Sequence, residues 1–248
     1  YIYSISNYIM AVSELVKENF MHLAILMTNT DTSAFSKKHP DDGQKFTALL
    51  HRVRPDWKID VYVVKDDIFP ATLDFDGLLI TGSPASVHDT TAWIPKLETL
   101  VRTAIHTKIP MFGACFGHQV IARALGAQVG HNPDGWVLGR IETKFETDGT
   151  TVPLYAAHKE QVLTLPEGAK TVARTPGCEI AGFAIDDHVL TTQYHPEMTN
   201  SFVKALLDAF ADDIGKETTD KAATTLDNDT DIDALAEWIA SFFEQANK

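Results

Sequence analysis

Cysteine is rare in this sequence: only two of its 248 residues are cysteines, Cys115 and Cys178. A small secreted scaffold held by disulfides has many more cysteines in a shorter chain, so that class is excluded. Two thiols in a chain of this size are typical of proteins in a reducing compartment. We therefore predict a cytoplasmic protein.

Basic residues are also few, with 21 Lys and Arg against 34 Asp and Glu and a net charge of −13. This balance provides no cationic surface for a phosphate backbone, so no nucleic-acid partner is expected. The acidity is concentrated between Asp208 and Glu237, where 10 acidic residues stand against 2 basic ones. We interpret that stretch as a solvated surface rather than as part of the chemistry.

Long apolar runs are absent as well. No uncharged apolar run approaches the roughly 20 residues that cross a bilayer, so no membrane partner is expected. The hydrophobic share, 44%, is nevertheless too high for a disordered chain. The length predicts one large domain, or one domain with appendages.

The first 20 residues are rich in aromatic and aliphatic side chains. They lack the basic start and the small-residue cleavage site of a signal peptide. We predict an N-terminal extension or leader over residues 1–20. An amphipathic helix is the alternative, and neither interpretation assigns chemistry to this segment.

Short apolar runs alternate with stretches of helical period from Met21 onward, which predicts parallel strands joined by helices. The predicted fold is therefore α/β, with three layers and a mostly parallel central sheet flanked by helices. The predicted strands are Leu23–Met27, Ile59–Val64, Gly77–Thr81, Pro110–Ala114 and Val189–Tyr194. Apolar residues at helical spacing predict helices around Phe46–Val53, Ile94–Ile105, Val120–Leu125 and Phe202–Phe210.

Glycine, proline and short β-rich pieces between Gly126 and Asp187 predict a small antiparallel excursion. Beyond the main domain, predicted over 21–214, the composition becomes polar and acidic. We predict a linker over 215–230 and an amphipathic helix over 231–248. We expect that helix to cover the core rather than dock a partner.

The most informative segment is Pro110-Met-Phe-Gly-Ala-Cys-Phe-Gly-His-Gln119. Cys115 lies at a strand-to-helix junction between Gly113 and Gly117, the spacing of a nucleophile elbow. The N-terminus of the following helix favours a thiolate, and the backbone N–H of Phe116 is available to an oxyanion. A buried structural cysteine and a metal site with His118 are the alternatives. No second pair of metal ligands follows, so we predict no metal.

A cysteine nucleophile needs a base, and His195 is the best candidate. It closes the last predicted strand in Gln193-Tyr-His-Pro-Glu197. Residues two apart in an extended segment face the same way, so Glu197 is placed to orient the imidazole. Pro196 ends the strand at this point. The predicted order Cys…His…Glu differs from that of the α/β-hydrolases, in which the acid precedes the histidine.

These two motifs resemble those of the class I (triad-type) glutamine amidotransferases, with a free-standing GMP-synthase-like domain as the nearest type. A third segment, Ile80-Thr-Gly-Ser-Pro-Ala-Ser-Val87, resembles the Gly-Gly-Pro-x-Ser loop of that family. The resemblance covers residues 21–214 and implies a flavodoxin-like fold. It implies that Cys115 is the nucleophile, His195 the base and Glu197 the group that orients it.

The resemblance also implies roles around this triad. The oxyanion would be held by N–H groups of Phe116 and of Gly82 or Ser83, where Ser83 replaces the second glycine of the family loop. Residues implied to bind substrate are Gln119, His158 and Trp136. The implied reaction is hydrolysis of a γ-glutamyl amide through a cysteine thioester, which releases glutamate and ammonia without a metal or organic cofactor.

Glutamine or another small γ-glutamyl compound is therefore the expected substrate. No phosphate-cradling motif follows Ile214, so a synthase that receives the ammonia is expected to be a separate partner. A γ-glutamyl peptidase on the same fold is the alternative enzyme. A catalytically silent regulatory or binding module is the alternative of another class, and the intact Cys115, His195 and Glu197 argue against it.

Overall fold

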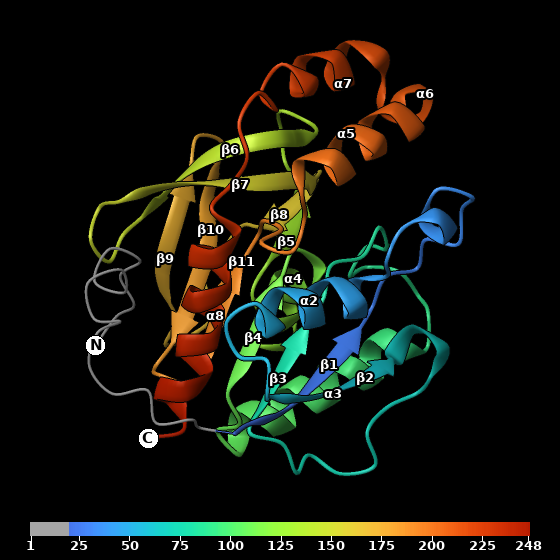
Figure 1. Cartoon of the computed structure of the whole chain (residues 1–248). Helices are drawn as coiled ribbons and strands as arrows, with labels where there is room; N and C mark the ends of the chain where they lie inside the picture. The colour runs from blue at the N-terminus through green and yellow to red at the C-terminus, as the bar shows by residue number, and fades with distance from the viewer. Residues whose placement is uncertain (1–19) are drawn as a thin grey trace.

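The computed structural model describes residues 20–248 (Figure 1), and the predicted extension over 1–20 lies outside the described residues except for Phe20. A nine-stranded sheet runs through the molecule in the order β2-β1-β3-β4-β11-β10-β9-β6-β7. Its first five strands are parallel and confirm the predicted ones to within about two residues at each end. They are β2 (Lys58–Val63), β1 (His22–Met27), β3 (Gly77–Ile80), β4 (Met111–Ala114) and β11 (Val189–Thr192).

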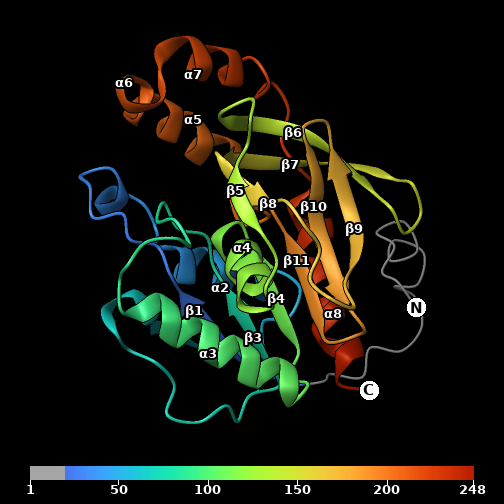
Figure 2. The same cartoon turned by 180° about the vertical axis from the view of Figure 1, so that it is seen from behind.

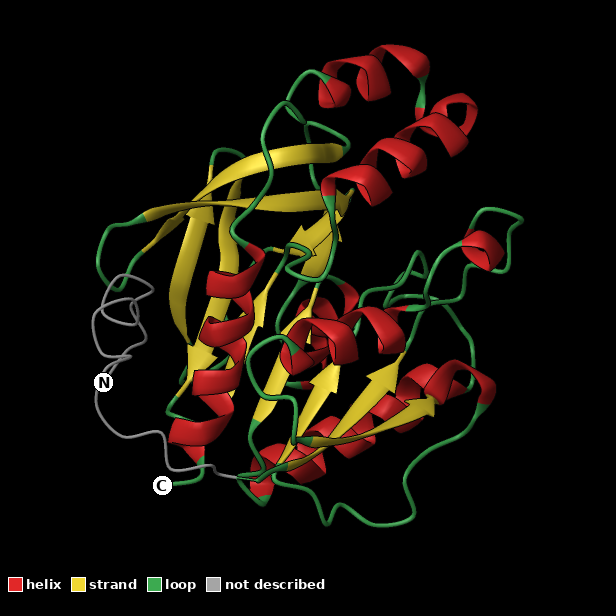
Figure 3. Cartoon of the chain, viewed as in Figure 1, coloured by secondary structure: helices red, strands yellow, loops and turns green. Residues whose placement is uncertain are grey.

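The antiparallel strands predicted between Gly126 and Asp187 are present, but four of them extend the central sheet (Figure 3). They are β10 (Cys178–Ile185), β9 (Lys170–Thr175), β6 (Val137–Phe145) and β7 (Thr151–His158). A tight turn at Asp186 pairs β10 with β11, so β11 has a parallel neighbour on one side and an antiparallel one on the other. A separate two-stranded sheet contains β5 (Val129–His131) and β8 (Glu160–Val162).

Helices cover both faces of the parallel strands and complete the three predicted layers. One face is covered by α2 (Asp42–His51) and α8 (Ile232–Ala246), and the other by α3 (Trp93–His106) and α4 (Phe116–Ala124) (Figure 2). In α8, Trp238, Ile239 and Phe243 are buried in the larger core cluster. This confirms that the C-terminal helix covers the core.

The acidic segment 215–230, predicted as a linker, contains the helix α7 (Lys216–Ala223). It follows α5 (Asn200–Ala209) and α6 (Ala211–Ile214), and all three gather beyond the β6–β7 hairpin (Figure 1). The linker prediction was wrong for this stretch because a few apolar contacts suffice to fix it. Ala222 and Leu226 are buried in a small cluster with Leu138 and Tyr155 of the hairpin, while the acidic and basic residues face outward. Between residues 20 and 248, no helix is long and apolar enough to span a bilayer.

Candidate active site

Cys115 has an unusual backbone conformation between β4 and α4, with φ 49° and ψ −105°. A residue with a side chain held there carries about 1–3 kcal/mol of strain, which persists only where the surroundings fix it. Its N–H donates to the Thr192 carbonyl at 2.9 Å, and its carbonyl accepts from the Gln119 N–H at 3.0 Å. The elbow predicted from the sequence is therefore present, with the thiol at the N-terminus of a helix.

Two glycines allow β4 and α4 to approach, as predicted. A Cβ atom on Gly117 would collide with the Ile80 carbonyl oxygen, and one on Gly113 would lie 2.6 Å from Ile121 Cδ1. The Gly117 N–H also donates to the Thr81 carbonyl at 3.1 Å, which ties the first turn of α4 to the end of β3. Any larger residue at either position would displace the helix that presents Cys115.

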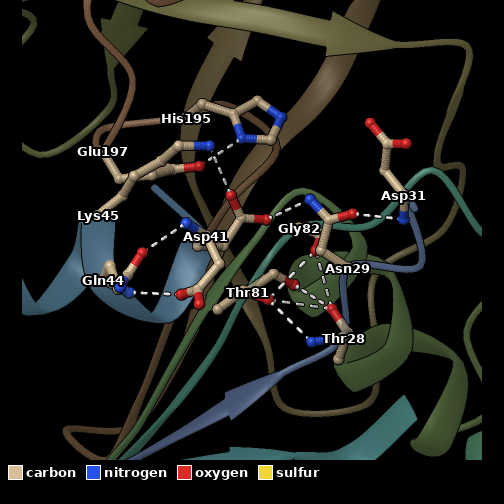
Figure 4. Close-up of polar contacts among 11 residues, drawn as sticks. Thr28, Asn29, Asp31, Asp41, Gln44, Lys45, Thr81, Gly82, His195 and Glu197 are labelled. Carbon is tan, nitrogen blue, oxygen red and sulfur yellow. Dashed lines mark hydrogen bonds and ion pairs between the residues drawn. The ribbon is translucent and has the colours of Figure 1, made fainter. Parts of the chain in front are cut away.

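His195 and Glu197 form a hydrogen-bonded pair. His195 Nδ1 lies 2.8 Å from Glu197 Oε1, and the two side chains are 6% and 0% exposed (Figure 4). The His195 N–H donates to the Tyr155 carbonyl at 2.8 Å, which fixes the backbone beyond the end of β11. The second ring nitrogen, Nε2, is buried and makes no hydrogen bond within residues 20–248, while Cys115 acts on the same ring through its charge and a side-chain contact.

The side chains of Cys115 and His195 both lie next to Gly82. A Cβ atom on Gly82 would lie 2.8 Å from His195 Cε1 and 3.5 Å from Cys115 Cβ. Burial alone would lower the pKa of His195, but the charges and hydrogen bonds of Glu197 and Cys115 outweigh it and raise that pKa well above its usual value. The site therefore favours the protonated form of His195 beside Cys115.

The loop after β3 is fixed by hydroxyl groups. The Gly82 carbonyl accepts hydrogen bonds from Thr28 Oγ1 at 2.9 Å and from Thr81 Oγ1 at 3.2 Å (Figure 4). In a trans peptide the N–H points opposite to the C=O, so the Ser83 N–H is directed away from Thr28. Ser83 does not have a positive φ, so serine in place of the second family glycine causes no backbone strain. Phe116 packs its ring on Trp93, which leaves only its backbone N–H for the site.

A cavity of about 700 Å³ contains this site. Cys115, His195, Gly82 and Ser83 line it, as does Trp136, which is 37% exposed. Cys115 follows β4 and Gly82 follows β3, so the cavity lies at the carboxyl ends of the parallel strands, where open α/β sheets bind their ligands. The cavity thus brings together the predicted nucleophile, its base and one of the predicted substrate-binding residues.

Two predicted substrate-binding residues, Gln119 and His158, are not among the residues that line the cavity. The Gln119 amide donates to the Glu160 carbonyl at 2.7 Å and to Gln193 Oε1 at 3.2 Å. His158 Nδ1 lies 3.1 Å from the same Glu160 carbonyl. Both side chains support the wall of the site from behind, and contact with substrate stays a prediction for each.

A family model for class I glutamine amidotransferases matches residues 39–213. The chain belongs to this family. Among the relatives of this amidotransferase is the Saccharomyces cerevisiae protein "Putative glutamine amidotransferase YLR126C", 34% identical over 72% of this chain and 79% of the relative. Gamma-glutamyl peptidase 3 of Arabidopsis thaliana is 26% identical over 86% of this chain and 92% of its own.

The fold is that of solved amidotransferase structures. The crystal structure of a glutamine amidotransferase from Thermotoga maritima superposes with a TM-score of 0.71, at 18% identity, over 92% of this chain and 97% of that one. The predicted fold class is thereby confirmed. Membership of the family indicates an enzyme of the amidohydrolase type.

Sequence reasoning missed much of the cavity wall of this amidotransferase. Asn29 and the loop with the 3₁₀ helix η1 (Ser36–Lys38) follow β1, and they line the cavity together with Lys45 of α2 and Phe202 of α5. One signal was available: Asn29 comes directly after the first parallel strand, at the edge where sites form. No motif marked the contribution of α5.

We predict that Gly82→Ala lowers kcat/KM by roughly 100-fold. The new Cβ atom would lie 2.8 Å from His195 Cε1 and would push the ring away from the thiol. Moving a catalytic group by about 1 Å lowers the rate by roughly 100-fold. Steady-state kinetics and thermal unfolding measure the effect. Gly77→Ala is the matched control, because its Cβ would lie 2.5 Å from Phe243 Cδ1 at the start of β3, and neither residue lines the cavity. Equal losses in both variants would contradict the prediction.

We also predict that acid destabilises this fold below about pH 6.5 through two buried histidines. Burial lowers the pKa of His118 to about 3 and that of His158 to about 4. The unfolded chain binds these protons near pH 6.5 while the folded chain does not, so stability falls as the pH drops. The loss is on the order of 3 kcal/mol per histidine by pH 4.5.

Urea unfolding at pH 7 and pH 4.5 tests this. His158→Gln should make the free energy of unfolding depend less on pH. His106→Gln, at an exposed position of α3, should leave this dependence unchanged. His195 acts in the opposite direction, since its raised pKa makes the folded chain bind this proton at higher pH than the unfolded chain does, and it is present in wild type and variant alike. An unchanged slope in His158→Gln would refute the assignment.

Proposed function

We propose that this chain hydrolyses γ-glutamyl amide bonds through a thioester on Cys115. One observation carries the proposal: a strained thiol at a helix N-terminus shares a cavity with an imidazole that a buried carboxylate orients. This combination is what nucleophilic acyl transfer by cysteine requires. Family membership supports it, since the relatives include a γ-glutamyl peptidase and a glutamine amidotransferase.

In the first half-reaction, the Cys115 thiolate attacks the δ-carbonyl carbon of the substrate. The resulting oxyanion accepts hydrogen bonds from the N–H of Phe116 and from that of Ser83 or Gly82, each worth about 2.7–4 kcal/mol in such a site. The C–N bond then breaks, and the protonated His195 gives its proton to the leaving ammonia or amine. The product is a γ-glutamyl thioester.

In the second half-reaction, water attacks the thioester and the neutral His195 takes its proton. The C–S bond breaks, glutamate leaves, and the thiolate and imidazolium are restored. Throughout both half-reactions Glu197 holds the Nδ1 side of the ring at 2.8 Å. We propose that Gln119, His158 and Trp136 shape the wall around the glutamate part of the substrate.

Glutamine and γ-glutamyl peptides differ only in the leaving group, and both are candidate substrates. The cavity volume of about 700 Å³ favours a leaving group larger than ammonia, as does the name of the Arabidopsis relative. With glutamine as substrate, we propose a separate synthase as the partner that receives ammonia. The two cysteines are unpaired, which supports a reducing, cytoplasmic location for either reaction.

Glutamate release by the purified chain tests the proposal. Glutamine and γ-glutamylalanine are assayed side by side. Acid-quenched samples are analysed by mass spectrometry, first intact for a γ-glutamyl adduct and then after digestion to find whether the adduct is on the peptide that contains Cys115. We expect turnover of at least one substrate and an adduct that hydroxylamine removes. Turnover without any adduct, or an adduct on another residue, would reject the thioester mechanism. Glutamine turnover that appears only with a second protein would identify a subunit.

A further inference from the structure

The cavity around Cys115 is larger than glutamine requires. Cavities of about 300–1,000 Å³ hold drug-sized ligands, and glutamine is a single amino acid. The cavity here measures about 700 Å³, and the nucleophile, His195 and Gly82 line only part of it. The remaining wall comes from the loop after β1 and from α5 and α6, which lie on the same side of the sheet in both views (Figures 1 and 2). Space is therefore left beyond the scissile amide.

Part of that remaining wall is aromatic. Phe35 and His39 of the loop face Phe202 and Phe210 of the helical group, and all four line the cavity. Ring centroids are 4.5 Å apart for Phe35 and His39, 5.2 Å for His39 and Phe202, and 5.5 Å for Phe35 with either Phe202 or Phe210. The four rings are half-buried, so part of each remains accessible from the cavity. We refer to these four residues as the aromatic wall.

One charged pair beside the aromatic wall is neutralised within the protein. Lys45 Nζ lies 3.7 Å from the centroid of the Phe202 ring and 2.9 Å from Asp42 Oδ1. Asn29 Nδ2 donates to the other oxygen of Asp42 at 2.7 Å. The Lys45 and Asp42 side chains are 11% and 5% exposed, so this pair supports the wall instead of offering a free charge. The four rings themselves offer a surface that suits an uncharged ring, although charged residues such as Lys37 and Asp213 also line the cavity.

We infer that the aromatic wall binds the leaving group of the substrate, and that the preferred substrates are γ-glutamyl amides whose amine carries an aromatic ring. The inference rests on the proposed function. The scissile C–N bond is cleaved by water as before, and the products are glutamate and the aromatic amine. A substrate ring packs on the wall edge-to-face or offset, as aromatic pairs do.

A pair of dipeptides tests the inference on the full chain. Wild type is expected to hydrolyse γ-glutamylphenylalanine with a kcat/KM roughly tenfold above that for γ-glutamylalanine, the size of one or two good aromatic contacts. Phe202→Ala and Phe210→Ala are each expected to lower this ratio several-fold. Phe75→Ala is the control, because Phe75 lies just before β3, at the end of the strand away from the cavity. Its ring centroid is 4.8 Å from that of His22. In this variant the ratio should stay at about tenfold.

The outcomes separate the two proposals. A wild-type ratio near one, or a ratio that survives both Phe202→Ala and Phe210→Ala, overturns the aromatic wall as a subsite, while hydrolysis of γ-glutamylalanine still upholds the proposed function. Release of glutamate from neither dipeptide nor glutamine overturns both. If Phe202→Ala fails to fold, Phe35→Leu on the facing loop carries the same test, with the ratio again as the readout.

Discussion

Cys115→Ala is expected to lower kcat for γ-glutamyl hydrolysis by at least about 10⁴-fold. Without the sulfur no thioester forms, and only binding and the oxyanion N–H groups remain to stabilise a direct attack by water. The variant should still fold, because alanine fits the same backbone and removes only the contact of the thiol with His195. Glutamate release measures the activity, and thermal unfolding confirms that the variant is folded.

The second cysteine provides the matched control. Cys178 is 0% exposed, and burial raises the pKa of its thiol to about 12, so it is unreactive near neutral pH. Cys178→Ala should keep its activity, and iodoacetamide should alkylate wild type and Cys178→Ala at Cys115 alone. Activity in Cys115→Ala close to that of wild type would show that another residue is the nucleophile.

The elbow was predictable because all the residues that form it are close together in the sequence. A strand, two glycines and a helix within ten positions define the backbone around Cys115, and the structure confirms each of these parts. The His195–Glu197 contact was predictable for a similar reason, since two residues in an extended segment share a side. What joins the two motifs is the parallel pairing of β4 with β11, a pattern that the alternation of strands and helices already indicated.

The aromatic wall was not predictable from sequence in this way. Phe35 and Phe202 are far apart in the chain, and their rings meet because α5 and α6 stand over the carboxyl ends of β1 and β3. That placement depends on a few buried contacts of α7 with the β6–β7 hairpin, in a stretch whose composition indicated a linker. Local patterns identify elements, whereas the position of a peripheral helical group depends on long-range packing that leaves little periodicity.

Glu197→Gln is expected to lower kcat by about 10³–10⁴-fold while the thiol and the imidazole remain present. The carboxylate accepts the Nδ1 hydrogen of His195 at 2.8 Å and fixes the tautomer whose Nε2 exchanges a proton with Cys115. An amide in its place can donate to Nδ1 and favour the wrong tautomer, an effect worth about 10⁴ in a comparable triad. Glu244→Gln is the control. Glu244 lies on α8 and its carboxylate pairs with Arg54, so this variant should change stability and not kcat.

The pH profile of the same variant distinguishes a catalytic from a structural role. The charge of Glu197 is one of the causes that hold the pKa of His195 well above its usual value, and glutamine removes that charge. The imidazolium then loses its proton at lower pH, so the basic limb of kcat/KM should move to lower pH. The thermal midpoint should fall as well, because removing one partner of a buried ion pair leaves the other charge uncompensated, so the position of the basic limb separates the two roles. A basic limb at the wild-type position, together with a lower midpoint, would make Glu197 a structural residue and leave His195 without its orienting group.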